Sequence, residues 1–577
     1  MDPHYCDGGG VFQGERCLTR RAALRAGAGL AAAMVAATGV GRASAANQDQ
    51  TPAASPAAGA LPDLTGVAPL PLTDERRAQF EAYVADALLR FGVPGASIAV
   101  VQNGDVVYLN GFGVQAAGST QAVDPDTMLM IGSVTKSMTT MLAATLVDDG
   151  RLTWETRLID LLPAFAVGDP VLTESLSVRD AFCNCIGIPG RDIELFFEGD
   201  AFTPEGVVTA LADVAPTAAR GERFQYNNLL IGAGGYAVGV AAEGSSDSVL
   251  RAYDIALRER VLGPIGMTRS TFWVEEVLAG GNYALPHATD LTERLQAIPV
   301  AAERTVLPAA PSGALWSNAR EMARYVQTEL ARGVAPSGTR VVSAEYLAET
   351  WAPGVALPSA PGPRSALTAA MTGYGLGWGS GDYLGQRLIS HSGGTFGFAS
   401  EVAFLPEANL GLVVLSNART LGSVFPYAVQ FRLLELLFDQ EATSDAELSA
   451  LVEMARAASG VALGAVDPAA VTPYLGRYGN PKLGGVTLSM RGGRLVLDVG
   501  EQSSELRPGA DTSGEAARYL MVDPPLSLLS EGGVSALSFA GAADGRPRLR
   551  LAVAAGQTGP EQEFVFAPVD ATEAASG

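Results

Sequence analysis

Residues 131–136 of the chain, Ile131-Gly132-Ser133-Val134-Thr135-Lys136, open a segment whose pattern predicts a buried helix. Ser133 and Lys136 are three positions apart, so on a helix they lie one turn apart and face the same side. The apolar residues that follow recur at three- and four-residue steps, as in a helix packed along one face: Val134, Met138, Met141, Leu142 and Leu146. Asp149-Gly150 predicts the end of this helix, because glycine readily adopts the left-handed conformation found there.

The residue types at Ser133 and Lys136 favour a chemical role. A serine in the first turn of a helix lies near free backbone N–H groups, and a basic amine one turn later can activate its hydroxyl as a nucleophile. The alternative is a capping serine beside a solvated lysine. The chain holds 39 Lys+Arg, of which only Lys136 and Lys482 are lysines. Arginine keeps its proton at working pH whereas a desolvated lysine can lose it, so we predict that Ser133 is the nucleophile and Lys136 its base.

The composition indicates a globular, strongly acidic protein. Hydrophobic residues make up 48% of the 577 residues, and the net charge is −22. Such a surface argues against nucleic acids and anionic membranes as partners. The three histidines and four cysteines form no zinc-binding pattern, so we predict no metal and no cofactor.

The N-terminal 45 residues resemble a twin-arginine export signal. Arg20 and Arg21 precede an alanine-rich run, and Ala43-Ser44-Ala45 supplies small residues for cleavage. This resemblance implies export of the folded protein to the periplasm, the cell envelope or the medium; a disordered basic leader is the alternative. Residues 46–71 are rich in Ala, Pro, Gly, Ser and Thr and predict a flexible linker. No later segment has the length and apolarity of a membrane span.

The remaining chain predicts two domains. Over residues 72–438, a helix and a hairpin come first, helices dominate from about 137 to 370, and strands and a final helix follow. This order predicts an α/β (α+β) fold in which a sheet is split in sequence by a helical insertion. Residues 439–470 predict a helical connector, and the short alternating strands of 471–568 predict a separate small β-barrel.

Two further motifs carry polar residues that suit catalysis. Tyr226-Asn227-Asn228 stands just before a predicted helix, where Tyr226 can shuttle a proton and Asn228 can hold a substrate amide. Tyr-x-Asn occurs twice more in the chain, but the flanking turn and the following helix favour this copy; a half-buried structural tyrosine is the alternative. His391-Ser392-Gly393-Gly394 begins where a strand should enter the sheet, and its glycines let a substrate backbone lie close. A structural histidine is the alternative for His391, and the favoured interpretation of His287.

Cys183 and Cys185 flank a single residue. We expect reduced, packed thiols; a local disulfide, formed after export to an oxidising compartment, and a catalytic role are the alternatives.

The ordered motifs Ser133-x-x-Lys136, Tyr226-x-Asn228 and His391-x-Gly393 resemble those of the serine β-lactamase and penicillin-binding-protein superfamily, in its class C β-lactamase, DD-peptidase, D-aminopeptidase and esterase branch. The resemblance covers about residues 72–438 and implies the β-lactamase/transpeptidase-like fold, an antiparallel sheet flanked by helices. Residues 471–568 resemble the lipocalin-like domain fused to some of these hydrolases.

The resemblance also implies roles for the site residues. Ser133 would be acylated, Lys136 would be its base, Tyr226 would relay the proton to the leaving group, and Asn228 would bind the substrate amide. His391 stands where dedicated β-lactamases carry lysine, and the backbone N–H groups of Ser133 and Gly394 would form the oxyanion hole. Histidine is a weaker cation at pH 7, so strong β-lactamase activity is not expected.

We therefore predict an exported serine hydrolase that forms an acyl-enzyme on a small amide or peptide, such as a D-amino-acid or peptidoglycan-like peptide. A carboxylesterase of the same fold is one alternative. A non-catalytic ligand-binding protein on this scaffold is another. The expected partner is a small-molecule or peptide substrate, and a homo-oligomer is compatible with this architecture.

Overall fold

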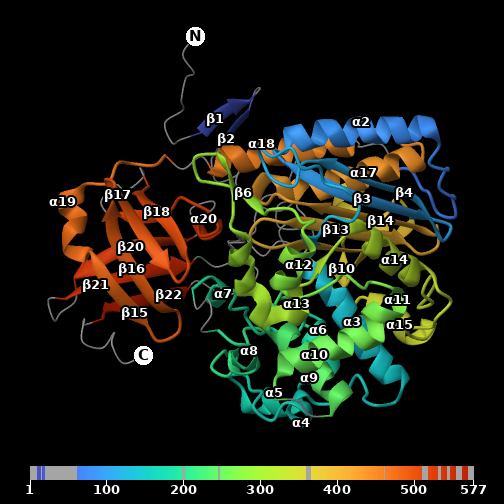
Figure 1. Cartoon of the computed structure of the whole chain (residues 1–577), viewed down its shortest axis with the longest axis horizontal. Coiled ribbons are helices and arrows are strands. Elements are labelled where there is room, and N and C mark those ends of the chain that lie inside the picture. The colour runs from blue at the N-terminus through green and yellow to red at the C-terminus, as the bar shows by residue number, and fades with distance from the viewer. Residues whose placement is uncertain are drawn as a thin grey trace.

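The structure is a computed structural model of the whole chain. It describes residues 10–13, 16–19, 61–197, 202–244, 247–358, 365–459, 462–509, 517–530, 535–541, 546–553 and 562–569. Two bodies stand out in Figure 1: a larger one built around a sheet, and a β-barrel beside it. Within the part of the chain described, no helix is long and apolar enough to cross a membrane.

The larger body is organised around one eight-stranded antiparallel sheet. Its strand order is β4-β3-β14-β13-β12-β11-β10-β9. The strands are β3 (Gly95–Gln102), β4 (Asp105–Gly113), β9 (Val355–Ala356), β10 (Gly373–Tyr374), β11 (Gly379–Tyr383), β12 (Gln386–Gly394), β13 (Ala399–Leu405) and β14 (Leu410–Ser416). β3 pairs with β14 across about three hundred residues of sequence, so the predicted split sheet is confirmed.

Helices cover both faces of this sheet. Residues of β3 alternate between two cores: Ile98 and Val100 pack into one, and Ala99 and Val101 into the other. Figure 1 shows α2 (Asp74–Arg90), α17 (Phe425–Leu437) and α18 (Ser444–Ser459) on one side of the sheet, with the helical insertion on the opposite side. Because both faces are covered, all eight residues of β3 are buried.

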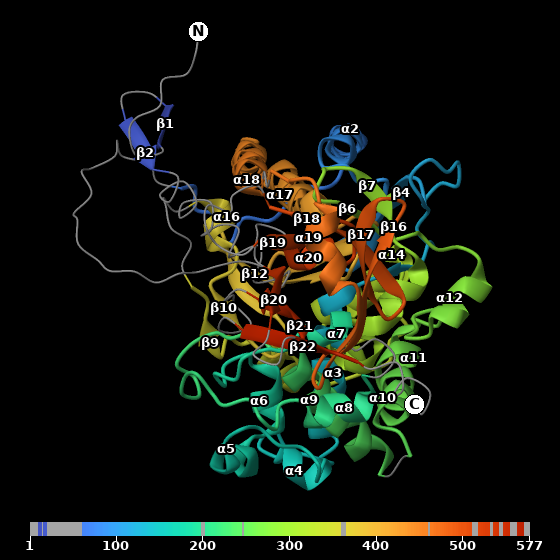
Figure 2. The same cartoon turned by 90° about the vertical axis from the view of Figure 1, so that its left-hand side faces the viewer.

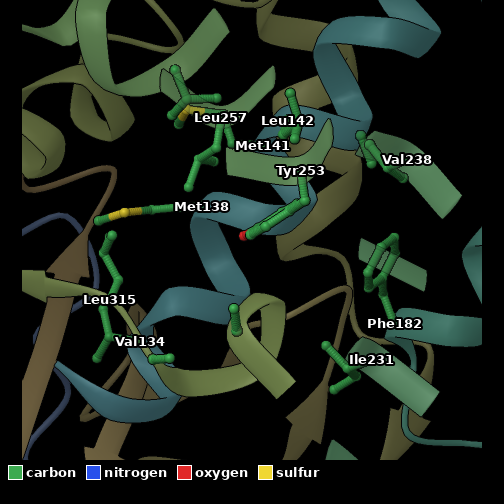
Figure 3. Close-up of a cluster of buried hydrophobic side chains, with 14 of the residues drawn as sticks. Val134, Met138, Met141, Leu142, Phe182, Ile231, Val238, Tyr253, Leu257 and Leu315 are labelled. Carbon is green, nitrogen blue, oxygen red and sulfur yellow. The ribbon is translucent and has the colours of Figure 1, made fainter. Parts of the chain in front are cut away.

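The helical insertion has α3 (Thr135–Asp148) at its centre. Every residue of this helix from Thr135 to Val147 is buried, and Gly150 after its end has φ 68°, as the sequence predicts. Figure 3 shows Met138, Met141 and Leu142 of α3 packed near Tyr253 and Leu257 of a neighbouring helix. The segment that begins with Ser133 is therefore the helix around which this half of the domain is packed.

The remaining helices and two small strand pairs complete the domain. The helices are η1 (Gly132–Val134), α4 (Leu158–Leu161), α5 (Pro170–Ser175), α6 (Val178–Phe182), α7 (Glu194–Phe197), α8 (Pro204–Thr209), α9 (Asn228–Glu243), α10 (Val249–Leu257), the π-helix η3 (Arg258–Leu262), α11 (Gly263–Ile265), α12 (Val274–Gly280), η4 (Val300–Ala309), α13 (Ala310–Gly313), α14 (Ala319–Leu330), α15 (Ala344–Trp351), α16 (Ala366–Ala369) and η5 (Thr420–Val424). Two small antiparallel pairs join β5 (Leu129–Met130) to β8 (Trp316–Ser317) and β6 (His287–Thr289) to β7 (Leu295–Ala297).

The C-terminal body is a closed barrel of eight strands. Its elements are α19 (Pro468–Val471), η6 (Thr472–Tyr474), β15 (Gly476–Asn480), β16 (Gly484–Arg491), β17 (Arg494–Val499), β18 (Gln502–Pro508), β19 (Arg518–Met521), α20 (Ser527–Ser530), β20 (Ser535–Gly541), β21 (Pro547–Val553) and β22 (Gln562–Pro568). The predicted all-β barrel is confirmed, and Figure 2, which faces it, shows α7 of the larger body near its strands.

The N-terminal expectations have mixed outcomes. Strands β1 (Gly10–Gln13) and β2 (Arg16–Thr19) form an antiparallel pair, whereas Arg20, Arg21 and the alanine-rich run lie outside the described residues, so the signal stays a prediction. For residues 61–71 the linker prediction is wrong. Leu64 is buried and its N–H donates to Leu384 O, and Leu70 N–H donates to Leu437 O. These contacts anchor the segment on the hydrolase domain before α2 begins.

Candidate active site

Ser133 and Lys136 lie at the junction of η1 and α3. Lys136 Nζ is 2.9 Å from Ser133 Oγ, because their spacing places them one turn apart on the same side. Ser133 is partly exposed whereas Lys136 is fully buried. The Ser133 hydroxyl, the candidate nucleophile, is therefore accessible to solvent, and the amine of Lys136 behind it is enclosed.

Lys136 has three partners that define its chemistry. Besides Ser133, its Nζ lies 2.7 Å from Asn228 Oδ1 and 2.5 Å from Ser312 O. Both of these oxygens only accept hydrogen bonds, so they engage two N–H groups of the amine and direct the third position at Ser133. Burial lowers the pKa of Lys136 to about 7, and the nearby Asp192 carboxylate opposes this shift. A neutral Lys136 would thus point its lone pair at the serine hydroxyl.

Tyr226 completes the contacts of the nucleophile. Its Oη donates to Ser133 Oγ at 2.9 Å, and Lys136 Nζ lies 4.8 Å from the centre of its ring. Burial raises the pKa of Tyr226 well above its usual value, so the hydroxyl keeps its proton at neutral pH. Tyr226 is thus a hydrogen-bond donor to the nucleophile.

A disulfide next to this tyrosine corrects our expectation about the two cysteines. Cys183 and Cys185 are bonded to each other, not reduced thiols. Asn184 between them has φ 51°, and its backbone and side-chain oxygens accept the N–H groups of Gln225 and Asn227. The disulfide loop therefore holds the residues on both sides of Tyr226. The sequence spacing permits this bond, but the packing that favours it is a tertiary feature.

His391 lies beside the site with both ring nitrogens occupied. Its Nδ1 lies 2.6 Å from Ser392 O, which only accepts, so Nδ1 carries the proton. Nε2 then accepts from the hydroxyl of Tyr374 at 3.0 Å. Burial lowers the pKa of His391 to about 3, and Lys136 acts in the same direction. The imidazole is neutral at pH 7, which makes it an even weaker cation than the sequence suggests.

Glycines allow the third motif to approach the nucleophile. Gly132 has φ 52°, and a Cβ there would lie 2.4 Å from Gly394 N. A Cβ on Gly393 would lie 2.0 Å from Ile131 O. Side chains at either position would separate strand β12 from the turn that carries Ser133. The close approach places the backbone of Gly394 against the turn that carries Ser133.

Strand β11 ends before these glycines. It pairs with β12 only as far as Gly379, which lies opposite Ser390. Residues 391–394 extend beyond the end of β11, while their other edge pairs with β13. His391 and Ser392 are buried in this stretch.

Three residues at the site were not identified from the sequence. Ser312 acts through its carbonyl oxygen, and any residue type offers one. Tyr374 belongs to none of the three motifs, and its bond to His391 depends on the pairing of β10 with β11. Asp192 Oδ2 accepts from Asn228 Nδ2 at 3.0 Å, and no sequence signal singled it out. His287 has structural partners, as expected: Ala117 N–H donates to its Nε2, and Nδ1 bonds Asn417 O.

A serine activated by a buried lysine, with a tyrosine on the same oxygen, is the catalytic apparatus of a serine hydrolase. A family model described as Beta-lactamase matches residues 78–436. The chain therefore belongs to the beta-lactamase family, and the resemblance noted from the motifs is confirmed.

Individual relatives agree with this assignment. Penicillin-binding protein 4 of Amycolatopsis lactamdurans is 31% identical over 337 residues, which cover 58% of this chain and 83% of that protein. The unguisins hydrolase ungD of Aspergillus violaceofuscus is 26% identical over 360 residues, covering 59% of this chain and 61% of that protein. The octameric penicillin-binding protein homologue from Pyrococcus abyssi superposes with a TM-score of 0.55 at 22% identity, over 86% of this chain and 100% of that one. That similarity shows the fold.

Proposed function

We propose that this hydrolase forms an acyl-enzyme on Ser133 with a small amide or peptide, such as a D-amino-acid or peptidoglycan-like peptide. One observation carries the proposal: Ser133 Oγ lies within 2.9 Å of both Lys136 Nζ and Tyr226 Oη. An enclosed amine with a pKa near 7 and a protonated phenol on one partly exposed hydroxyl suit acyl transfer.

The proposed reaction follows from these contacts. Neutral Lys136 takes the proton of Ser133 as Oγ attacks the substrate carbonyl carbon. The carbonyl oxygen becomes an oxyanion that the N–H groups of Ser133 and Gly394 stabilise. The C–N bond then breaks as Tyr226 donates its proton to the departing amine, and the proton on Lys136 returns to the tyrosine oxygen. Water attacks the acyl-enzyme by the same proton transfers and releases the acid.

The neutral His391 bears on the substrate class. A substrate carboxylate gains little from an uncharged imidazole, so we expect weak or no β-lactamase activity and substrates that need no carboxylate beside the scissile bond. This observation also favours the second candidate, a carboxylesterase, because esters need less leaving-group protonation than amides. The relatives are named as a penicillin-binding protein and an unguisins hydrolase, which supports a hydrolase.

Location and assembly are also part of the proposal. The twin-arginine-like segment supports export, and a disulfide at Cys183 and Cys185 is compatible with an oxidising compartment. The structural relative from Pyrococcus abyssi is described as octameric, which supports a homo-oligomer.

A substrate panel tests the function. Wild type, Ser133→Ala and the exposed-site control Ser337→Ala are assayed with D-amino-acid amides, D-dipeptides and p-nitrophenyl esters. Amide turnover that Ser133→Ala abolishes and Ser337→Ala retains supports the amidase. Turnover of esters alone favours the esterase. No turnover of either class by the wild type favours the non-catalytic ligand-binding protein.

A further inference from the structure

Asp192 is a carboxylate in direct contact with the amide that supports the lysine. Its Oδ2 accepts from Asn228 Nδ2 at 3.0 Å, and Asn228 Oδ1 accepts from Lys136 Nζ at 2.7 Å. The residue as a whole is partly exposed, but its Oδ1 is closed off from solvent and receives no hydrogen bond from the described residues. Burial raises the pKa of Asp192, while Asn228 and Lys136 oppose this shift.

The contact has a consequence for the orientation of Asn228. An asparagine amide can be turned either way, and its neighbours decide which end faces which. Asp192 Oδ2 accepts a hydrogen bond from Asn228 Nδ2, so the NH2 end of Asn228 faces the carboxyl group. The oxygen end must then face Lys136, where it accepts one N–H and helps to aim the amine at Ser133.

The segment that carries Asp192 is anchored in the C-terminal barrel. Ile193 lies just before α7, and Phe197 is its last residue. Both belong to the hydrophobic core of the barrel. The ring of Phe197 lies 6.0 Å from that of Phe566 on β22. Figure 1 shows α7 on the side of the larger body that faces the barrel. The barrel thus encloses side chains from the chain segment directly after Asp192.

Two more contacts hold the same segment. Arg191 pairs with Asp213 at 2.6 Å, and Asp213 also pairs with Lys482, in the barrel, at 2.6 Å. Phe196 packs on Phe396 at 4.9 Å between ring centres, in the hairpin that follows Gly394. Residues 191–197, which we term the strap, therefore contact the barrel, the second motif and the third-motif hairpin.

We propose that Asp192 is a positioning residue that fixes Asn228 against Lys136, and that the barrel holds the strap so that Asp192 stays in place. This rests on the proposed function of Ser133 and Lys136. The barrel is then a required part of the hydrolase active site.

The first test measures phosphonylation of Ser133 by a fluorophosphonate, in which Oγ attacks phosphorus and fluoride leaves, as a function of pH in Asp192→Asn. Asp160→Asn, which removes an exposed carboxylate paired with Arg157, is the matched control. We expect the plateau rate of Asp192→Asn to fall on the order of 10-fold, part of the roughly 10²–10⁴-fold that general-base catalysis contributes. The pH at which the rate falls to half of its plateau should be lower by about one unit, because the Asp192 charge that favours protonated Lys136 is gone. A lower plateau rate with no shift along the pH axis would mean that Asp192 has a merely structural role, which would overturn the proposal. A pH–rate profile identical to that of the wild type would also overturn it.

The second test addresses the barrel. Phe197→Ala removes the contact between the strap and Phe566 of the barrel. Phe539→Ala removes a barrel phenylalanine that stacks on Tyr474. We expect Phe197→Ala to slow phosphonylation of Ser133 at least fivefold more than Phe539→Ala does, with faster hydrogen exchange in residues 191–197. Equal effects of the two variants would refute the role of the barrel.

A readout without activity separates this proposal from the proposed function. If wild type and Asp160→Asn are not labelled, the hydrolase assignment itself fails. The urea unfolding midpoints of Asp192→Ala, Asn228→Ala and the double variant still report on the contact. We expect non-additive changes, and additive ones would contradict the link between Asp192 and Asn228.

Discussion

Lys136 Nζ lies 2.9 Å from Ser133 Oγ, and the lysine side chain is fully enclosed by protein. The cost of burying its charge explains why its pKa falls to about 7. The amine is therefore available as a base at neutral pH, and neither histidine in the described part of the chain bonds the serine.

This lysine predicts the pH dependence of acylation. The neutral amine is the active form, so the rate should rise as pH increases and level off above an apparent pKa of about 7. Stopped-flow acylation with an ester substrate between pH 5 and 9 checks this. Lys136→Arg should lose on the order of 10³-fold at every pH, because arginine keeps its proton. A flat profile in the wild type would show that another group is the base.

The glycine before the nucleophile gives a prediction about packing. Gly132→Ala places a Cβ 2.4 Å from Gly394 N in a left-handed residue, and should destabilise the protein by about 2–4 kcal/mol and prevent acylation. Gly492→Ala is the control, since Gly492 has φ 55° but nothing within 4 Å of its Cβ. Urea unfolding should show a loss of about 1 kcal/mol for Gly492→Ala. Similar losses in the two variants would mean that β12 does not approach Gly132 this closely.

The neutral imidazole of His391 gives a prediction about specificity. With a pKa near 3 it carries no charge at pH 7, so a free carboxylate next to the scissile bond should give little advantage. Matched pairs of D-dipeptides and their C-terminal amides test this through kcat/KM, and we expect ratios within about threefold. A preference for the free acid above about tenfold, which corresponds to about 1.4 kcal/mol, would show a cation at this position.

The disulfide gives a prediction about the second motif. Replacing both Cys183 and Cys185 by serine should cost about 1.5 kcal/mol of stability, since a short loop constrains the unfolded chain only slightly. The larger effect should be on kcat, because Asn184 would no longer hold Gln225 and Asn227 in place beside Tyr226. Alkylation mass spectrometry should find no free thiol at these positions until reductant is added. Two free thiols in protein purified without reductant would refute the bond.

Some of this architecture can be predicted from the sequence because it depends on local patterns. The apolar residues that recur at three- and four-residue steps after Ser133 predict α3. Asn-Gly at 103–104 predicts the β3–β4 hairpin, and short alternating strands predict the barrel. The spacing of Ser133 and Lys136 places them together on any helix. Tyr226 and Asn228 contact Ser133 and Lys136 although they are about 90 residues away in sequence. The resemblance of the ordered motifs to a hydrolase family predicts that these residues share one site.

The remaining features depend on packing that no local pattern records. The charge of His391 is set by burial and by Tyr374, and the anchoring of residues 61–71 depends on Leu384 and Leu437. Asp192 is an ordinary aspartate in sequence, and its bond to Asn228 depends on long-range contacts of its segment, including those with the barrel. The spacing of Cys183 and Cys185 permits a bond between them, but it does not decide between that bond and two reduced thiols.

The most direct measurement of the central claim is intact-mass analysis after incubation with a fluorophosphonate. We expect a single adduct on the wild type, located on Ser133 by peptide mapping, no adduct on Ser133→Ala, and a normal adduct on Ser337→Ala. An adduct that survives in Ser133→Ala, or no adduct on the wild type between pH 6 and 9, would contradict the assignment of Ser133 as the nucleophile.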